Sequence, residues 1–248
     1  MLQGQSDHLK ERDPESGRFR SLDAFSGSLA ARTYLSLREA ILDLRCRPGE
    51  PLRKAEICET LGISRSPAAE AIARLAAEGL VEVVPQAGTF VARFSMDEIR
   101  EGAFLREAIE LAAMETLAPA ITDEQLVRLR RNIRVQEALI EDGDYAGFYK
   151  LDREFHELIL SFTGYRKLIQ VAESAWVHVN RARRLVLPVP GRVAATLDEH
   201  RAILKALEKR NPELARKEMR DHLRQLMTFL APLEKEHPDL FEPKKSNS

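Results

Sequence analysis

The sequence predicts a mainly α-helical protein that contains one small β-hairpin. Apolar residues recur at helical spacing through most of the chain, as Tyr34, Leu37 and Ile41 do in the first periodic stretch. Two short runs rich in β-branched residues flank a turn signal at residues 86–88, which is the pattern of a hairpin. After residue 95 the helical pattern continues through six or seven segments, and no alternating strand pattern interrupts it.

Composition restricts the class of protein. The 248 residues are 44% hydrophobic and 31% charged, which suits a globular chain and not a disordered one. No apolar run reaches the roughly 18 residues of a membrane helix, and the polar N-terminus does not resemble a signal peptide. Cys46 and Cys58 are the only cysteines, so we expect no disulfide framework and a reducing, cytoplasmic location.

The patterns divide the chain into four segments. Residues 1–27 are polar and aperiodic, which indicates a disordered N-terminal extension. Residues 28–94 hold the first helices and the hairpin, residues 95–233 hold the remaining helices, and residues 234–248 form a C-terminal tail. The junction at Phe94-Ser95 is too short for a free tether, so we expect two domains in close contact.

Three helices precede the hairpin in the segment 28–94. The first starts near residue 29 and stops at Pro48-Gly49, a pair that breaks helices. The second covers residues 54–61 and is broken by Gly62. The third covers about residues 64–79, begins with a serine cap and tolerates a proline in its first turn. Two helices with a tight turn, followed by a hairpin, predict a winged helix-turn-helix unit.

A winged helix-turn-helix places the first turn of its second motif helix against base edges in the major groove. That turn reads ISRSP, in which the arginine offers a bidentate contact to guanine and the serines can bond bases or phosphates. The predicted DNA-contacting residues are Ser64, Arg65 and Ser66 in this turn, with Gln86, Gly88 and Thr89 at the hairpin tip. The alternative is a small helical subdomain that carries a surface arginine and no nucleic acid.

The segment resembles the winged-helix domain of GntR-type bacterial transcription regulators. The shared features are LREAILDLRCRPGEPL and LGISRSPAAEAIARLAAEGLVEVVPQAGTFVA, over about 65 residues. The resemblance implies operator DNA as partner and adds Arg53, because some members carry an arginine near this position. Ala69 stands where the family commonly has a further arginine. Residues 31–100 contain ten basic and ten acidic residues, so affinity should depend on placed contacts more than on counterion release.

The segment 95–233 contains an unusual polar pattern. The stretch LDREFHELIL is typical of a buried helix, yet it carries an acid and a histidine one turn apart. Two further helices also have a histidine on an apolar face. The four residues are Asp152, His156, His200 and His222. Three imidazoles and a carboxylate suit a divalent ion such as Zn²⁺, Ni²⁺ or Mn²⁺. The alternatives are structural Asp–His hydrogen bonding, a metal-dependent hydrolase with an accessory DNA-binding domain, and a helical scaffold without a ligand.

These helices resemble the FadR C-terminal-domain type of effector-binding module in GntR regulators. FLREAIELAAMETLAP is similar to its first helix, and DREFH, LDEH and MRDHL match its metal-binding signatures, so the resemblance covers about residues 29–231. It implies an antiparallel all-α helical bundle, a homodimer, and a divalent ion that helps to bind a small carboxylate effector.

Four residues are candidates to bind the effector: Arg106, Asn180, Arg181 and Arg183. For Arg106 the alternative is an i,i+4 ion pair with Glu110, and for the run at 180–183 it is a solvated face. No catalytic residue is predicted. We therefore expect a cytoplasmic, homodimeric transcription regulator, not an enzyme, whose effector alters operator binding.

Overall fold

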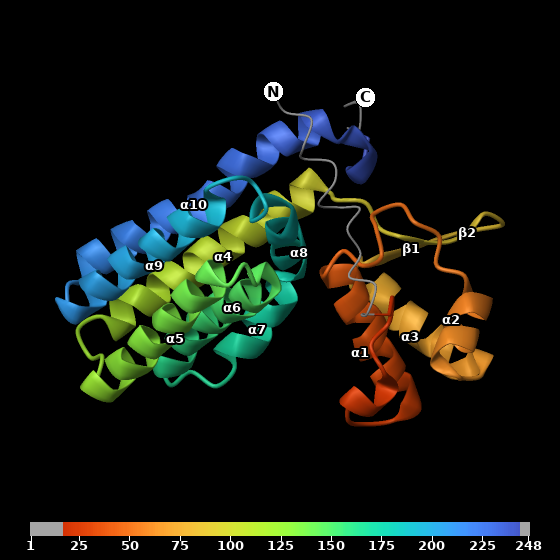
Figure 1. The fold of residues 1–248 in the computed structure, drawn as a ribbon, viewed down its shortest axis with the longest axis horizontal. Coiled ribbons are helices and arrows are strands. Elements are labelled where there is room, and N and C mark those ends of the chain that lie inside the picture. Colours follow the sequence, from red (N-terminus) through yellow and green to blue (C-terminus); the bar gives the residue numbers. More distant parts are fainter. Residues whose placement is uncertain (1–16, 244–248) are drawn as a thin grey trace. The chain divides into compact units, whose positions relative to one another are not determined.

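The computed structural model describes residues 17–243, and it divides them into two compact units (Figure 1). The first unit contains residues up to Met96 together with residues from Glu234 onward, and the second contains Asp97–Leu233. The predicted fold class is confirmed: the first unit carries helices and one hairpin, and the second is all-helical. No described helix is long and apolar enough to cross a membrane.

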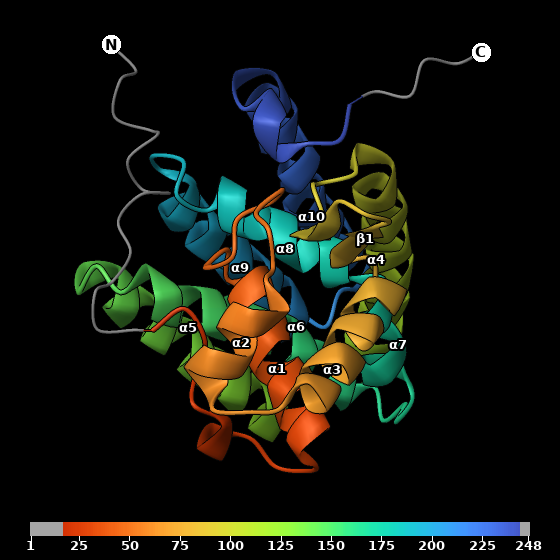
Figure 2. The ribbon, with the colours of Figure 1, turned by 90° about the vertical axis from the view of Figure 1, so that its right-hand side faces the viewer.

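The first unit is a winged helix. Its elements are α1 (Leu29–Leu42), α2 (Lys54–Leu61), α3 (Arg65–Ala77), β1 (Val81–Val84) and β2 (Gly88–Val91). The helix α3 packs against both α1 and α2, and Figure 2 shows these three helices gathered together. Fully buried apolar side chains from each helix, such as Leu37, Ile57 and Leu75, form the core between them.

Local chemistry explains the turns of this unit. Gly62 has φ +63°, the left-handed conformation that ends α2, and Ser64 in extended conformation is the N-cap of α3. The hairpin pairs β1 and β2 in antiparallel register, with Val81 opposite Val91 and Val84 opposite Gly88. Its tip therefore consists of residues 85–87, and the predicted turn at 86–88 is displaced by one residue.

Residues 17–27 are structured, so the expectation of a disordered extension up to residue 27 is wrong for this part. A short 3-10 helix spans Leu22–Ala24, and Phe19 and Leu22 are buried. The Ser36 hydroxyl on α1 donates to the carbonyl of Arg20 at 2.7 Å. Two isolated apolar residues in a polar stretch give no periodic signal. Both are nevertheless buried, and they help to hold this segment against the winged-helix unit. Residues 1–16, which the same expectation covers, lie outside the described residues.

The C-terminal segment also differs from the expected tail. Helix α10 (Pro212–Glu236) continues into it, and a 3-10 helix spans Pro238–Leu240. The Phe94 N–H donates to the carbonyl of Leu240, and the Glu242 N–H donates to the carbonyl of Phe94, both at 2.9 Å. The Phe94 and Phe241 rings lie 5.5 Å apart and are both buried. We call residues 238–242 the C-terminal clasp, because they pair with the strand that leaves the hairpin.

The second unit is built from seven α-helices within the described residues. Before α10 they are α4 (Met96–Leu117), α5 (Asp123–Glu141), α6 (Tyr145–Phe162), α7 (Leu168–Ala175), α8 (Val177–Val186) and α9 (Arg192–Glu208). The long helices α4, α5, α6, α9 and α10 run lengthwise along the unit (Figure 1). Helix α5 packs against α6 and α9. Short connections, such as 142–144 and 209–211, turn the chain back between successive helices.

Polar side chains cap the starts of two helices in this unit. Thr122 and Gln125 form a reciprocal capping box at the start of α5. At the start of α10, the Asn211 side-chain oxygen accepts the N–H of Leu214 at 2.9 Å. On α6 the buried face contains Phe148, Phe155 and other apolar residues, and the polar residues of the candidate site lie in this same face.

Removal of the Phe241 ring should destabilise the winged-helix unit, although Phe241 lies in the last residues of the chain. The substitution Phe241→Ala leaves a cavity beside Phe94 and should lower the free energy of unfolding by about 3 kcal/mol. Phe241→Leu, which keeps most of the apolar volume, should lower it by less than about 1.5 kcal/mol. Urea denaturation monitored on the winged-helix unit measures both. If both substitutions lowered the free energy of unfolding by the same small amount, the clasp would not stabilise this unit.

Candidate metal centre and DNA-binding surface

Four side chains from three helices meet inside the second unit. Asp152 and His156 come from α6, His200 from α9 and His222 from α10. One ligand atom from each lies within 4.8 Å of the others, and all four residues are buried. Two i,i+4 positions on α6 share one helix face, which explains why its acid and histidine enter the same space. The structure thus brings together all four residues predicted as metal ligands.

Two of the four inner atoms of this cluster lack a hydrogen-bond partner. The Nε2 atoms of His156 and His222 lie 3.2 Å apart. The Nε2 atom of His200 lies 3.5 Å from Oδ1 of Asp152, and neither of these two buried atoms has a hydrogen-bond partner. A buried polar atom without a partner costs free energy of about 1–3 kcal/mol. Three imidazole nitrogens and a carboxylate oxygen fit a divalent cation, which would satisfy all four atoms at once.

The outer nitrogen of each imidazole is held by a side-chain oxygen. The Nδ1 contacts are to Glu110 Oε2 at 2.5 Å from His156, to Gln136 Oε1 at 2.9 Å from His200, and to Glu199 Oε2 at 2.7 Å from His222. An acceptor at Nδ1 places the proton there, so each Nε2 presents its lone pair to the centre. This outer arrangement is the one that orients histidines in metal sites.

Burial also keeps two of the imidazoles, those of His156 and His200, in the form that binds metals. Desolvation, together with the positive charge of Arg106, holds the pKa of His156 well below its usual value. Desolvation and the neighbouring His222 lower the pKa of His200 in the same way. Both rings are therefore neutral at neutral pH, with no proton to displace from the inner nitrogen.

Three arginines surround the cluster, and each donates to an acid of the site. Arg183 donates to Oδ2 of Asp152. Arg106 donates through Nε to Oε1 of Glu110 at 2.7 Å. The two terminal nitrogens of Arg192 donate to the two carboxylate oxygens of Glu199, at 2.5 and 2.7 Å. The two outer acids therefore each join an arginine to a histidine of the cluster.

A pocket opens beside the cluster, and the empty space in and around it, open solvent included, is about 340 Å³. It is lined by Arg106, Arg183, Arg192, Thr196 and His222, and by the apolar residues Val186, Leu187, Leu223 and Leu226. Arg106 and Arg183, two of the four predicted effector residues, therefore line this pocket. Arg106 also forms the ion pair with Glu110 that was the alternative interpretation. Its Nε donates to Glu110, and the residue still lines the pocket.

The other two predicted effector residues are not brought to this pocket. Arg181 is fully buried elsewhere on α8, and Asn180 is half-buried, with its backbone carbonyl accepting from the Tyr149 hydroxyl. His178, one turn before Arg181, lies outside the cluster, with Nδ1 3.5 Å from Glu98.

Sequence reasoning did not assign a site role to five residues that build this centre: Glu110, Gln136, Arg192, Thr196 and Glu199. The signal that found Asp152 was a polar residue on an apolar helix face. The same signal is present at Glu110 and Gln136, which are both fully buried. Glu199 precedes His200 directly, so only the rotation of α9 shows that it supports His222 instead.

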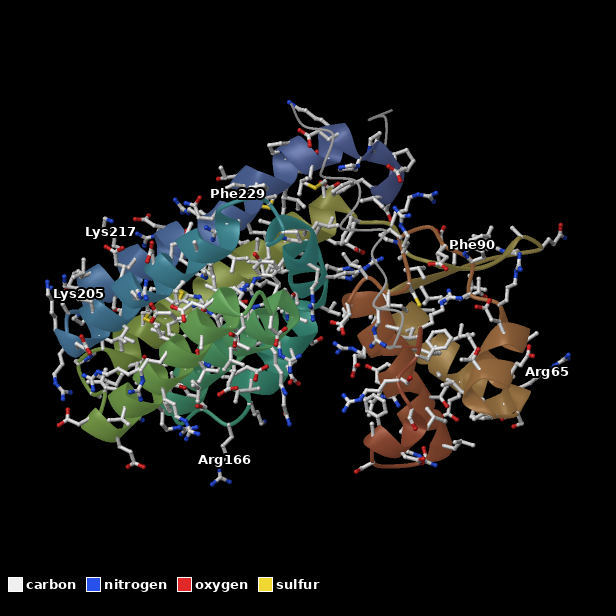
Figure 3. All side chains as sticks on the ribbon, in the orientation of Figure 1. Arg65, Phe90, Arg166, Lys205, Lys217 and Phe229 are labelled. Carbon is white, nitrogen blue, oxygen red and sulfur yellow. The ribbon has the colours of Figure 1, made fainter. Side chains whose placement is uncertain are left out.

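The predicted DNA-contacting residues lie on the surface of the winged-helix unit. Ser64, Arg65 and Ser66 are exposed at the start of α3, and the Arg65 side chain projects away from the fold (Figure 3). The Ser64 hydroxyl makes no capping hydrogen bond, so it remains available to a ligand. Arg53, Gln86 and Gly88 are also exposed, and Thr89 is half-buried.

Comparison with known families defines the class of protein. Residues 29–91 match the bacterial regulatory proteins of the gntR family, and residues 101–225 match the FCD domain. The chain therefore belongs to the GntR family of DNA-binding transcription regulators and carries an FCD effector-binding domain, as the sequence motifs predict.

Individual relatives agree with this assignment. The chain is 35% identical over 208 residues to an HTH-type transcriptional regulator in an unstable DNA locus of Streptomyces ambofaciens, which covers 84% of this chain and 87% of the relative. It is 31% identical, over 84% of this chain and 91% of the relative, to the HTH-type transcriptional repressor RspR of Escherichia coli K12. Both relatives are HTH-type transcriptional regulators.

Solved structures share the fold. The E. coli protein McbR/YncC superposes with a TM-score of 0.71 at 21% identity, covering 84% of this chain and 99% of that protein. A GntR transcriptional regulator from Rhodococcus sp. RHA1 superposes with a TM-score of 0.73 at 24% identity, covering 83% of this chain and 99% of that one.

The buried pair of Arg183 and Asp152 should be essential to the metal-free unit. Arg183→Met leaves the Asp152 carboxylate buried without its cation and should lower the free energy of unfolding by about 3–5 kcal/mol. Arg201→Met, which breaks exposed ion pairs to Glu137 and Asp198, should lower it by less than about 1 kcal/mol. Urea denaturation of chelator-treated protein compares the two. A similarly small decrease in the free energy of unfolding for both variants would show that the buried pair is not essential.

Proposed function

We propose that this regulator is a homodimer that holds one divalent metal ion with Asp152, His156, His200 and His222. A small carboxylate effector binds beside the ion and changes the affinity for operator DNA. The observation that carries the proposal is the unpartnered pair at the centre, Asp152 Oδ1 and His200 Nε2, both fully buried. An ion of the Zn²⁺, Ni²⁺ or Mn²⁺ type supplies the missing partner and a local positive charge.

The chain's own residues prepare the site for both ligands. Glu110, Gln136 and Glu199 hold the rings in the metal-binding tautomer. Arg183 fixes the Asp152 carboxylate through Oδ2, which leaves Oδ1 for the ion. The effector enters the pocket beside His222, where arginine donors suit a carboxylate.

The alternatives are less well supported by the same contacts. Hydrogen bonding alone explains the outer nitrogens of the imidazoles, but it leaves the inner atoms of Asp152 and His200 unpartnered. A hydrolase needs a general base near the ion. Among the described residues around the centre, the acids Glu110 and Glu199 are already engaged by an arginine and a histidine each.

The DNA-binding half of the proposal rests on exposure and family. Arg65, Ser64 and Ser66 present their side chains at the start of α3, while Arg53 and the hairpin residues Gln86, Gly88 and Thr89 contact the backbone or a groove edge. Paired helix-turn-helix units read two half-sites, which requires a dimer. Only four residues separate β2 from α4, so effector binding can shift the spacing of two units in the cytoplasmic dimer.

Metal content is the direct test of the site. Freshly purified protein should contain about one divalent transition-metal ion per chain, and zinc should raise the melting temperature of chelator-treated protein. His200→Ala and His222→Ala should lose the ion. His178→Ala, a histidine on the same unit outside the cluster, should retain it. Wild-type protein without transition metal and without a thermal response to Zn²⁺, Ni²⁺ or Mn²⁺ would rule out the proposal.

Arg65 should be required for operator recognition. A DNA sequence selected from a random pool by the wild-type protein serves as the probe in a mobility-shift titration. Arg65→Ala should weaken specific binding by about tenfold or more, because a bidentate contact to guanine is worth about 1–3 kcal/mol. Arg166→Ala removes the same charge from an exposed position on the other unit and should leave binding unchanged (Figure 3). Equal affinity of the Arg65→Ala and wild-type proteins would refute the contact.

A further inference from the structure

The buried charges around the metal centre cancel before any ion is bound. The positive side chains at the site are Arg106, Arg183 and Arg192, and the negative ones are Glu110, Asp152 and Glu199. Each cation is paired with one of the anions, and the imidazoles bind a metal in their neutral form. The protein alone therefore brings three positive and three negative charges to this region.

A divalent ion adds two positive charges to this balanced region. Asp152, His156 and His200 are nearly inaccessible, so water reaches the ion chiefly through the pocket beside His222. Uncompensated charge in a buried environment is strongly unfavourable. A monoanion cancels one of the two added charges, whereas a dianion cancels both.

The pocket wall also has donors for a second carboxylate. Arg106 uses only Nε to bond Glu110, and its terminal nitrogens make no hydrogen bond within the described residues. Arg183 uses one terminal nitrogen on Asp152 and keeps its other donors. Arg192 differs, because both of its terminal nitrogens already bond Glu199. Arg106 and Arg183 can therefore receive a carboxylate without giving up their own acids.

We infer that the effector is a short-chain dicarboxylate, with one carboxylate at the ion beside His222 and the other on Arg106 and Arg183. The remaining pocket wall is apolar, formed by Val186, Leu187, Leu223 and Leu226, and it suits a short methylene chain between two charged ends. The inference rests on the proposed metal site, and it specifies the charge of the ligand that this site accepts.

Matched ligands test the second charge directly. Zinc-loaded wild-type protein is titrated calorimetrically with malonate, succinate and glutarate, and with malonamate, succinamate and glutaramate. Each monoamide keeps the skeleton of its diacid and replaces one carboxylate by a neutral amide. At least one diacid should bind about tenfold or more tightly than its monoamide at the same ionic strength.

Substitution of Arg106 identifies where the second carboxylate binds. In Arg106→Gln the preference of the best diacid over its monoamide should fall to less than about threefold. Arg100→Gln, on the same helix and paired at the surface with Asp97, should keep the wild-type preference. Zinc content is measured in each variant, so that loss of the ion is distinguished from loss of the carboxylate contact.

The outcomes separate the two levels of the proposal. If the wild-type protein binds no divalent ion, both the proposed metal site and the proposed dicarboxylate effector are rejected. If zinc binds but the diacids bind no better than their monoamides, or none of the six binds, the dicarboxylate is overturned and the metal site stands. A diacid preference that persists in Arg106→Gln would overturn the assignment of the second carboxylate.

Discussion

The polar groups that lie inside an apolar helical bundle determine how the second unit is built. A carboxylate and three imidazoles are buried between α6, α9 and α10, and each must find partners there. The outer atoms have them: Glu110, Gln136 and Glu199 come from three different helices to meet the imidazoles. The inner atoms are left facing one another. A bundle that satisfies every outer atom and leaves a compact inner group fits the proposed ion better than it fits a packing defect.

The same requirement connects the pocket to the cluster. Glu110 and Glu199 each accept from an arginine of the pocket and from a histidine of the centre. If the proposed effector pulls on Arg106, it changes the acid that orients His156, so the proposed ion and effector would influence each other's affinity. Such reciprocity is a thermodynamic requirement once two ligands share partners. In the proposed mechanism, this relay connects the effector to His222 on α10.

The sequence predicts the ligand set because a polar residue on an apolar helix face is visible in the spacing alone. Asp152, His156, His200 and His222 all break an otherwise apolar stripe. The pocket is less predictable, since successive residues point about 100° apart on a helix and small rotations decide which one faces inward. Arg183 reaches the pocket while Arg181 does not. The clasp is outside the reach of pattern analysis, because Phe241 pairs with Phe94 from the opposite end of the chain.

Charge balance governs the DNA-binding unit as well. Ten basic and ten acidic residues between 31 and 100 leave little net field, so the sequence-independent attraction to phosphate is weak. In the proposed dimer, operator affinity then depends on contacts from a few exposed residues at the start of α3, which each of the two units provides. Weak background attraction makes such a dimer sensitive to geometry, since the second unit loses its placed contacts when its spacing no longer matches the half-site. A regulator with little net charge on its winged helix can therefore be released by a small displacement, which is within reach of a ligand that binds one arrangement better than another.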